Sequence, residues 1–381
     1  MPSLCVIFEA IGPYSAIGKI AMRDVETALE AGYKVSVVAK MLDESLRDRV
    51  EWLKLYVPPR GHALQWLTAR HFVKRALGNR KFDIVHGHQP QIADLCDVFQ
   101  CHYLTRVAHE RRCLTSGTGW GAWHRAVQHR IVLRAEDYFY RRWNPHTTML
   151  FNSALTREQF IRLYGRPERE QVLVPPVESA AIPNEAQRRA ARKALTGETE
   201  PGIVVGHLGG VQRRKGYHHL IEAMKREPGN GLFLLMGGIH SEGFDVPELA
   251  GRFRAVGLVS DVDQFYAACD VLAVPSLYEP LGLVAFEAAA RGVPVIATRD
   301  VGALPHLEQA GAGVAWEPKE SLETVARQLL EQRDDFRQNA HRMAGALSHE
   351  HSSERLLVVY EAILREKATR RTMLAPATTP H

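Results

Sequence analysis

The stretch from Pro275 to Thr298 constrains the fold more than any other part of the chain. A β-rich run ends at Pro275, a polar loop follows, Pro280 and Gly282 open an alanine-rich helix, and a second apolar run begins after Gly292. Alanines let a helix lie close against a sheet, and two apolar runs joined by one helix are typical of a parallel βαβ unit. The sequence therefore predicts an α/β protein with parallel sheets.

The helix in this stretch begins at an expected anion site that two carboxylates bracket. First-turn amides have no intrahelical partner and carry the positive end of the helix dipole, so an anion is favoured above Pro280 to Leu283. Glu279 precedes the helix and Glu287 lies about one to two turns inside it, so we expect them at opposite ends of a ligand. A nucleotide sugar, with hydroxyls on both sides of a pyrophosphate, suits this layout.

Glu279 and Glu287, with Pro-Leu-Gly-Leu between them, resemble the paired-glutamate signature of retaining GT-B-fold glycosyltransferases of family 4. The resemblance implies that Glu287 binds the ribose hydroxyls and that Glu279 reaches the donor sugar. It also implies that the amides of Leu281, Gly282 and Leu283 lie near the sugar hydroxyls and the phosphate. The implied fold is α/β, with two Rossmann-like domains whose parallel sheets face each other across a cleft.

A length of 381 residues suggests two domains of about 170 residues each. We expect an acceptor-side domain over residues 1–176 and a donor-binding domain over residues 177–350. The resemblance implies that a helix over residues 354–367 packs back on the first domain, and residues 368–381 are expected to be a disordered tail. Further predicted elements are a strand over 255–259, a loop over 301–305 and one helix over 320–348.

The composition, with 45% apolar and 24% charged residues, is that of a soluble globular protein. No apolar run approaches the roughly 20 residues needed to span a bilayer. Met1 to Ala10 is interpreted as a first strand rather than a signal peptide, so a cytoplasmic location is expected. Five cysteines, an odd number without a CxxC pair, indicate reduced thiols rather than disulfides or a zinc site.

The chain opens with a predicted βαβ unit. It comprises a strand over Leu4–Phe8, a loop, a helix over Lys19–Ala31 and a strand over Lys34–Ala39. The stretch from Gly12 to Lys19 has the glycines and lysine of a phosphate-binding P-loop, but the glycine spacing is wrong and no Ser or Thr follows the lysine. In the resembling family, adjacent glycines here lie beside the donor diphosphate, and Gly12 takes that place in this chain.

Histidines follow two further predicted strands, where open α/β sheets place ligands. Residues 82–88 end in His86 and His88, and residues 98–103 end in His102 and Tyr103. His86 and His88 could ligate a metal, but no partnering carboxylate or cysteine pattern is visible, so acceptor-site lining is the preferred interpretation together with Tyr103. The resemblance implies that His102 contacts the donor sugar near the reacting carbon; a purely structural histidine is the alternative.

Residues 106–142 combine arginines with tryptophans and tyrosines. This composition suits an anionic membrane surface or a phosphorylated acceptor, and it is also compatible with a solvated helix pair or with nucleic acid. A membrane surface or anionic glycolipid is the preferred interpretation, and no nucleic-acid partner is expected. The layout of residues 93–176 is similar, more loosely, to bacterial lipopolysaccharide core glucosyltransferases.

A second phosphate site is predicted after the strand over residues 203–208. Two glycines, Gly209 and Gly210, precede Arg213, Arg214 and Lys215, and a helix over 217–225 follows. Small residues allow a phosphate to approach and the cations neutralise it, with Lys215 as the first candidate. The resembling family has an arginine five residues before this lysine; here that position is Gly210, so Arg213 or Arg214 would replace it.

The backbone before the next helix, over residues 264–269, reads the base in the resembling family, which points to Leu258 and Val259. Asp261 and Asp263 could bind a metal on the donor diphosphate, but Asp261 is better placed to cap this helix, so no metal is expected.

These features predict a glycosyltransferase. We expect it to move a sugar from a nucleoside diphosphate sugar, UDP-sugar favoured, to a glycan, glycolipid or lipopolysaccharide-type acceptor in cell-envelope biosynthesis. The resemblance implies retention of configuration, and no cofactor or metal is expected. The expected location is cytoplasmic, with peripheral attachment to the inner face of the plasma membrane. Two alternatives remain open: a catalytically silent, membrane-associated nucleotide-sugar-binding module, and a nucleotide-sugar epimerase of the same fold.

Overall fold

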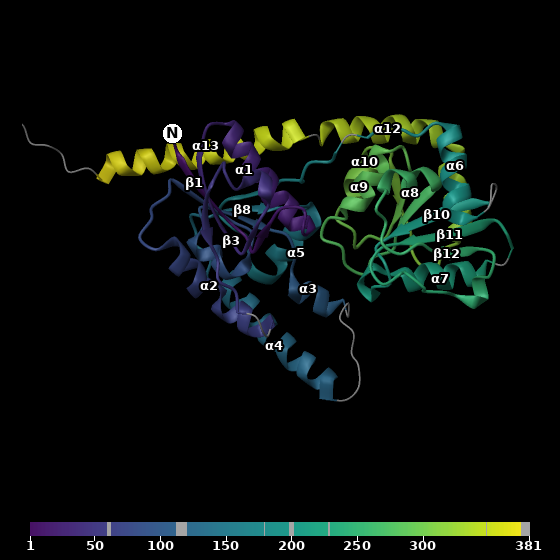
Figure 1. Ribbon diagram of the computed structural model, residues 1–381, viewed down its shortest axis with the longest axis horizontal. Coiled ribbons are helices and arrows are strands. Elements are labelled where there is room, and N and C mark those ends of the chain that lie inside the picture. Colours follow the sequence, from purple (N-terminus) through teal and green to yellow (C-terminus); the bar gives the residue numbers. More distant parts are fainter. Residues whose placement is uncertain are drawn as a thin grey trace, which may run out of the picture. The chain divides into compact units, whose positions relative to one another are not determined.

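The computed structural model describes residues 1–58, 62–111, 120–178, 180–197, 202–227, 229–347 and 349–374. The chain divides into two compact units, each built on a parallel sheet (Figure 1). The N-terminal unit comprises the described residues of 1–106, 116–175 and 350–381, and the C-terminal unit those of 107–115 and 176–349.

The N-terminal unit has a seven-stranded sheet in the order β5-β3-β1-β6-β7-β8-β9. Its strands are β1 (Ser3–Ile7), β3 (Lys34–Ala39), β5 (Glu51–Lys54), β6 (Ile84–Gly87), β7 (Val98–Cys101), β8 (Thr148–Phe151) and β9 (Glu170–Val172). All of the pairings are parallel. A separate pair, β2 (Ala10–Ile11) and β4 (Met41–Leu42), ties the loop after β1 to the loop after β3.

Helix α1 (Ala16–Glu30) shows why the chain folds this way locally. Ser15 caps the helix by accepting a hydrogen bond from the Gly18 amide at 3.0 Å, so α1 begins three residues before the predicted start. Its inward face carries Ala21, Val25 and Ala28, which join the core against β1 and β3. Asp24 lies buried on this same face.

The other helices of the N-terminal unit are α2 (His62–Leu77), α4 (Trp120–Tyr140), α5 (Ala154–Tyr164) and α13 (His349–Leu374), while α3 (Thr105–Glu110) lies mostly in the segment 107–115 of the C-terminal unit. Helix α13 runs along this unit and contributes Leu356, Tyr360 and Ile363 to its core (Figure 1). Its Ser353 hydroxyl lies 2.9 Å from that of Thr27 in α1. The C-terminal helix is therefore part of the N-terminal core.

The C-terminal unit has a six-stranded parallel sheet in the order β12-β11-β10-β13-β14-β15, the doubly wound order of dinucleotide-binding folds. Its strands are β10 (Ile203–Leu208), β11 (Leu232–Gly237), β12 (Phe253–Ala255), β13 (Val271–Val274), β14 (Val295–Ala297) and β15 (Gly313–Ala315). Its helices are α6 (Glu185–Thr196), α7 (Tyr217–Arg226), α8 (Val262–Ala268), α9 (Leu283–Ala290), α10 (Leu304–Gln309), α11 (Leu322–Glu331) and α12 (Arg333–Ala346).

Four predicted segments differ from the structure. The strand predicted over 255–259 ends at Ala255, because Gly257 adopts a φ of +71° and leaves the ladder. The helix predicted over 320–348 is two helices that meet at Gln332. The loop predicted over 301–305 contains the start of α10. The predicted disordered tail is wrong for residues 368–374, which continue α13, and residues 375–381 lie outside the described part of the chain.

The structure also bears on two expectations drawn from the composition, the state of the cysteines and the absence of a membrane-spanning segment. Of the five cysteines, Cys5, Cys96, Cys101 and Cys269 are free and buried, while Cys113 lies outside the described residues, as does Arg112 of the arginine-rich segment. Among the helices of the described residues, none combines the length and the apolar character needed to cross a membrane.

Candidate functional site

The strand orders locate a ligand site in each sheet. In an open parallel sheet, ligands bind at the carboxyl ends of the strands where the order reverses. The order reverses between β10 and β13 in the C-terminal unit and between β1 and β6 in the N-terminal unit. In the C-terminal unit the loops at this point are residues 209–216 and 275–282, which contain most of the predicted donor-binding residues.

These two loops pack backbone against backbone, which only glycine permits. Gly216 has a φ of +73°, and a Cβ there would lie 1.8 Å from the Pro275 carbonyl oxygen. Gly210 packs in the same way against a third loop, the one after β11: it has a φ of +67°, and a Cβ there would lie 2.0 Å from the Ile239 carbonyl oxygen. The glycines of the predicted phosphate loop therefore allow close loop packing, and they leave the basic side chains to reach the second loop.

A cluster of three charged side chains joins the two loops. The Glu279 carboxylate accepts hydrogen bonds from Lys215 Nζ at 2.6 Å and from Arg214 Nη1 at 2.9 Å. Arg214 Nη1 also donates to the Tyr278 carbonyl oxygen at 3.1 Å. The sequence left two arginines as candidates for the partner of Lys215. Arg214 shares Glu279 with Lys215, whereas Arg213 is exposed. The cluster carries a net charge of about +1 next to a helix N-terminus.

The loop before α9 is held in place by a second loop. Glu279 and Val301 form an isolated bridge, in which the Glu279 amide donates to Asp300 O at 2.9 Å and the Gly302 amide donates to Glu279 O at 2.9 Å. Gly282, with a φ of +90°, is the N-cap of α9. Leu281, Gly282 and Leu283 thus lie at the start of the helix, where its dipole favours an anion.

Glu287 is oriented by a residue that the sequence did not single out. Glu287 lies on α9, and its Oε2 accepts a hydrogen bond from the Tyr266 hydroxyl of α8 at 3.0 Å. Burial, with the neighbouring carboxylate, raises the pKa of Tyr266 well above its usual value, so the hydroxyl stays a donor. The Arg291 guanidinium lies 5.3 Å from the centre of the Tyr266 ring. Tyr266 thus fixes one oxygen of the Glu287 carboxylate.

The residues predicted to read the base and to cap α8 lie in the same unit. Leu258 is 76% exposed, and Val259 packs over Gly237. Asp261 accepts a hydrogen bond from the Gln264 amide at 2.9 Å, which confirms its capping role. Asp263 pairs with Arg291 at 2.6 Å.

The N-terminal unit contains a cavity of about 340 Å³ near the carboxyl ends of β1, β6 and β7. His88, His102 and Tyr103 line it, whereas His86 is not part of its lining. Five polar atoms of lining residues are buried without a hydrogen-bond partner among the described residues: Nε2 of His88, Oε1 of Gln89, Oε1 of Gln91, Oε1 of Gln100 and Nδ1 of His102. Buried polar groups normally have partners, so these atoms mark a place for a polar ligand.

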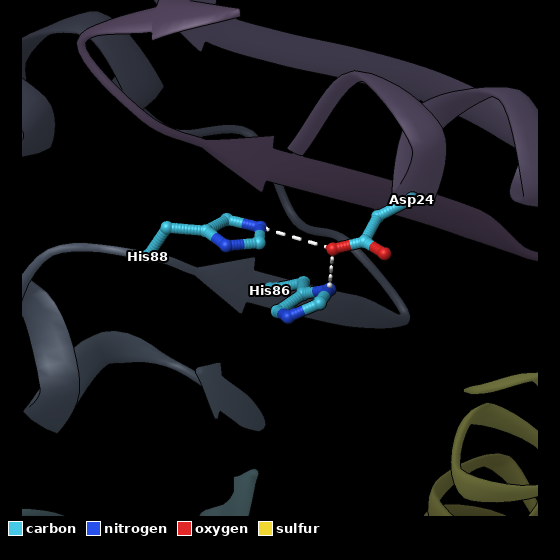
Figure 2. A group of neighbouring side chains, drawn as sticks. All are labelled: Asp24, His86 and His88. Carbon is cyan, nitrogen blue, oxygen red and sulfur yellow. Dashed lines mark ion pairs between the residues drawn. The ribbon is translucent and has the colours of Figure 1, made fainter. Parts of the chain in front are cut away.

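The histidines behind this cavity form a buried network. His102 Nε2 lies 3.0 Å from His88 Nδ1, and His88 Nε2 lies 3.4 Å from Asp24 Oδ2. His86 Nδ1 lies 2.8 Å from the Tyr360 hydroxyl and 4.0 Å from Asp24 Oδ2. Figure 2 shows the Asp24 carboxylate facing both His86 and His88. The structure thus supplies the carboxylate that the sequence pattern did not reveal.

Burial keeps this network uncharged. It raises the pKa of Asp24 to about 8 and lowers the pKa values of His86 and His102 to about 3. Asp24, His86 and His88 could offer three ligand atoms to a cation, but the His86 and His88 rings stack with centroids 4.5 Å apart and His86 Nδ1 is engaged by Tyr360. The hydrogen bonds of His86 with Tyr360 and of His88 with His102 suit this arrangement better than a tetrahedral metal site, and Asp24 Oδ2 has no hydrogen-bond partner among the described residues.

Gly12 has a local structural role. It has a φ of +144°, and its amide donates to the Gly18 carbonyl oxygen at 3.1 Å, which closes the loop before α1. Its expected place beside a diphosphate stays a prediction.

Comparisons with known proteins find similarity mainly in the C-terminal part of the chain. Residues 188–344 match the family described as "Glycosyl transferases group 1". D-inositol 3-phosphate glycosyltransferase of Geodermatophilus obscurus is 29% identical over 251 residues, 60% of this chain and 56% of that protein. Lipopolysaccharide core biosynthesis glycosyltransferase LpsE of Rhizobium meliloti is 42% identical over 104 residues, 26% of this chain and 30% of that protein. The chain thus spans about half the length, or less, of these curated relatives.

Solved structures match over nearly the whole chain. WaaG, a glycosyltransferase involved in lipopolysaccharide biosynthesis, has a TM-score of 0.71 at 19% identity and covers 93% of this chain and 99% of its own. Anabaena Alr3699/HepE in complex with UDP-glucose has a TM-score of 0.63 at 18% identity and covers 97% and 100%. At such identities the likeness shows the fold alone. The chain therefore has the GT-B fold of two Rossmann-like domains, and its residues 188–344 match the glycosyl transferases group 1 family.

Proposed function

We propose that the chain is a glycosyltransferase of family 4 type that transfers a sugar from a nucleoside diphosphate sugar to a hydroxyl acceptor with retention of configuration. The observation that carries this proposal is the cluster of Arg214, Lys215 and Glu279 at the N-terminus of α9, with Glu287 further along the same helix. Cations and helix amides suit a diphosphate, and the two carboxylates suit hydroxyls on either side of it.

In this proposal the cluster acts on the leaving group. Negative charge grows on the diphosphate as the sugar departs, and Lys215, Arg214 and the first amides of α9 stabilise it where it develops. These groups supply the positive charge that a divalent cation provides in other transferases, so we propose a reaction without a metal. Glu279 then turns from its cations towards the sugar hydroxyls, and Glu287, held by Tyr266, binds the ribose.

A UDP-sugar is the donor we favour, because Anabaena HepE, a neighbour in fold, is seen with UDP-glucose. For the acceptor, the cavity of the N-terminal unit favours an uncharged sugar ring. Its described lining contains no lysine or arginine, includes the acids Glu9 and Glu136, and presents the partnerless Gln91 and Gln100 oxygens beside aromatic rings. Neutral hydroxyls match such groups better than a phosphate does.

A membrane surface is proposed as the place where the acceptor is met. Helix α4 carries the exposed aromatic residues Trp123 and Tyr138, which are 60% and 53% exposed. It also exposes Arg125, Arg130 and Arg134, and Arg141 and Arg142 are exposed directly after its end. Arg106, by contrast, is engaged by Asp137. Flotation with anionic vesicles at low and high salt tests the membrane proposal. Absence of binding at both salt concentrations contradicts it.

Isothermal titration with UDP, GDP, ADP and uridine tests the donor proposal. We expect one nucleoside diphosphate to bind in the micromolar range and uridine to bind far more weakly. Glu287→Gln keeps the size of the side chain but loses its charge, so we expect a weakening of about 10-fold or more through the ribose contact. A silent binding module would bind the nucleotide without consuming its sugar, and an epimerase would return an altered nucleotide sugar. Absence of binding by any nucleoside diphosphate excludes all three functions.

A further inference from the structure

Asp24, His88 and His102 form a continuous path from the interior of the N-terminal unit to its cavity. Asp24 comes from α1, His88 follows β6 and His102 follows β7, and they are 7%, 3% and 7% exposed. Asp24 Oδ2 lies 3.4 Å from His88 Nε2, and His88 Nδ1 lies 3.0 Å from His102 Nε2. The path ends at His102 Nδ1, which lies in the cavity lining without a partner.

In this path the two imidazoles engage each other through His88 Nδ1 and His102 Nε2, and their other nitrogens, His88 Nε2 and His102 Nδ1, have no hydrogen-bond partner among the described residues. A neutral imidazole has one N–H donor and one lone-pair acceptor, so fixing one nitrogen fixes the other. His88 Nδ1 is engaged by His102, and its Nε2 lies 3.4 Å from Asp24 Oδ2, which likewise has no hydrogen-bond partner among the described residues, so these two atoms can only pair with each other. The protonation state of Asp24 therefore decides the role of each nitrogen along the path, including the partnerless Nδ1 of His102, a residue that lines the cavity.

Two arrangements follow from this rule. When Asp24 is protonated it donates to His88 Nε2, His88 Nδ1–H donates to His102 Nε2, and His102 carries its proton on Nδ1 as a donor into the cavity. When Asp24 is ionised, His88 Nε2–H donates to Asp24, His102 Nε2–H donates to His88 Nδ1, and His102 Nδ1 becomes an acceptor. The change from the first state to the second releases one proton to solvent.

We propose that Asp24 and His88 are positioning residues that set, through this path, which tautomer His102 presents to a sugar hydroxyl in the cavity. The inference rests on the proposed function for the identity of the ligand, but not for the tautomer itself. The groups that face Asp24 are His88 and His86 from β6 and its end, and Tyr360 from α13. No lysine or arginine of the described residues is paired with Asp24, so no fixed cation holds it ionised.

The environment favours the first state near neutral pH. Burial raises the pKa of Asp24 to about 8, while it lowers the pKa of His102 to about 3 and that of His88 well below its usual value. The imidazoles are thus neutral, and the proton lies on Asp24. His102 Nδ1 is then a hydrogen-bond donor at pH 7, and it becomes an acceptor as the pH rises past about 8.

Nitrogen-15 NMR of the histidine side chains in the full chain tests the proposal directly. We expect the His102 resonances at pH 7 to show the proton on Nδ1, and to move to the Nε2-protonated pattern between pH 7 and 9. Asp24→Asn places an amide donor opposite His88 Nε2 and is expected to hold the Nδ1 tautomer at both pH values. Asp43→Asn, the same substitution at a partly exposed side chain that caps a turn, is the control and should leave the change in place.

The readouts separate this inference from the proposed function. If the tautomer changes as expected and no nucleotide sugar is consumed, the network stands and the proposed function fails. If the protein is a transferase, a second result is expected. In wild type kcat changes with pH near pH 8; in Asp24→Asn this change is absent, and KM for the donor stays within about twofold of the wild-type value. A His102 tautomer that is the same in wild type and Asp24→Asn at every pH overturns the inference. One equivalent of tightly bound zinc in the purified protein also overturns it, because a metal would then occupy the path.

Discussion

Replacing Lys215 with methionine tests the charge cluster where it acts. Lys215 is 17% exposed at its side chain and donates to Glu279 at 2.6 Å, and the methionine keeps most of the chain length without the charge. A hydrogen bond to a charged group contributes about 1.5–3 kcal/mol. At about 1.4 kcal/mol per tenfold change, losing the contact to a diphosphate should weaken UDP binding by about 10- to 150-fold.

The assay is isothermal titration of UDP, UMP and uridine into wild type and Lys215→Met. The loss should be large for UDP, smaller for UMP and within about twofold for uridine, because only the phosphates reach the cluster. Arg213→Met, at the exposed neighbour, is the matched control and should change UDP binding much less. Equal weakening for UDP and uridine would refute the reasoning, since the lysine would then act on the fold rather than on the phosphate.

Glu279→Gln should have the opposite effect on the product nucleotide. It removes the negative charge from between two cations, so the cluster rises from about +1 to about +2 and UDP should bind more tightly. Turnover of the UDP-sugar should fall, because the glutamine lacks the charge that we assign to the sugar hydroxyls. The two measurements together separate phosphate binding from sugar positioning.

Further expectations concern stability. Gly216→Ala should lower the free energy of unfolding by about 2 kcal/mol or more in urea, because it combines a left-handed φ with a backbone clash. Arg188→Met should cost about 3 kcal/mol, because Arg188 is 2% exposed and donates to Asp270 at 3.0 Å; Arg189→Met on the exposed face of the same helix should cost less than about 0.5 kcal/mol. The pKa of Asp24 is about 8 in the folded state against an ordinary value of 3.8, so the stability that its protonated form contributes is lost as the pH rises towards 8. The Tm should therefore fall between pH 6.5 and 8.5. Asp24→Asn should remove that fall.

The sheets and the donor loops could be predicted from the sequence because their signals are local. Apolar runs, glycines and prolines mark the strands and turns around Pro275 to Thr298, and the structure places β13, α9 and β14 there. The sequence predicts Lys215 and Glu279 as donor-binding residues, but the ion pair between them depends on the close packing of Gly216 against Pro275. That contact spans loops far apart in the sequence.

Tyr266 and Asp24 were missed for different reasons. In the sequence, Tyr266 has the pattern of an ordinary core aromatic residue. Only the packing of α8 beside α9 brings its hydroxyl to Glu287. Asp24 did leave a signal, since it is an acid on the apolar face that also carries Ala21, Val25 and Ala28. A charge on a buried stripe needs a polar partner. Its partners, His86 and His88, lie on a strand about 60 residues later, where the sequence gives no pairing rule.

The central claim is that this chain transfers a sugar from a nucleoside diphosphate. The measurement that tests it most directly is proton and phosphorus NMR of wild type with UDP-glucose, UDP-galactose or UDP-N-acetylglucosamine and a panel of neutral sugar acceptors, without added metal. We expect one donor to yield UDP in step with a new α-glycosidic signal, at a rate that Lys215→Met lowers about 10-fold or more. UDP-sugars that remain unchanged, or that change only into an epimeric nucleotide sugar, would contradict the account.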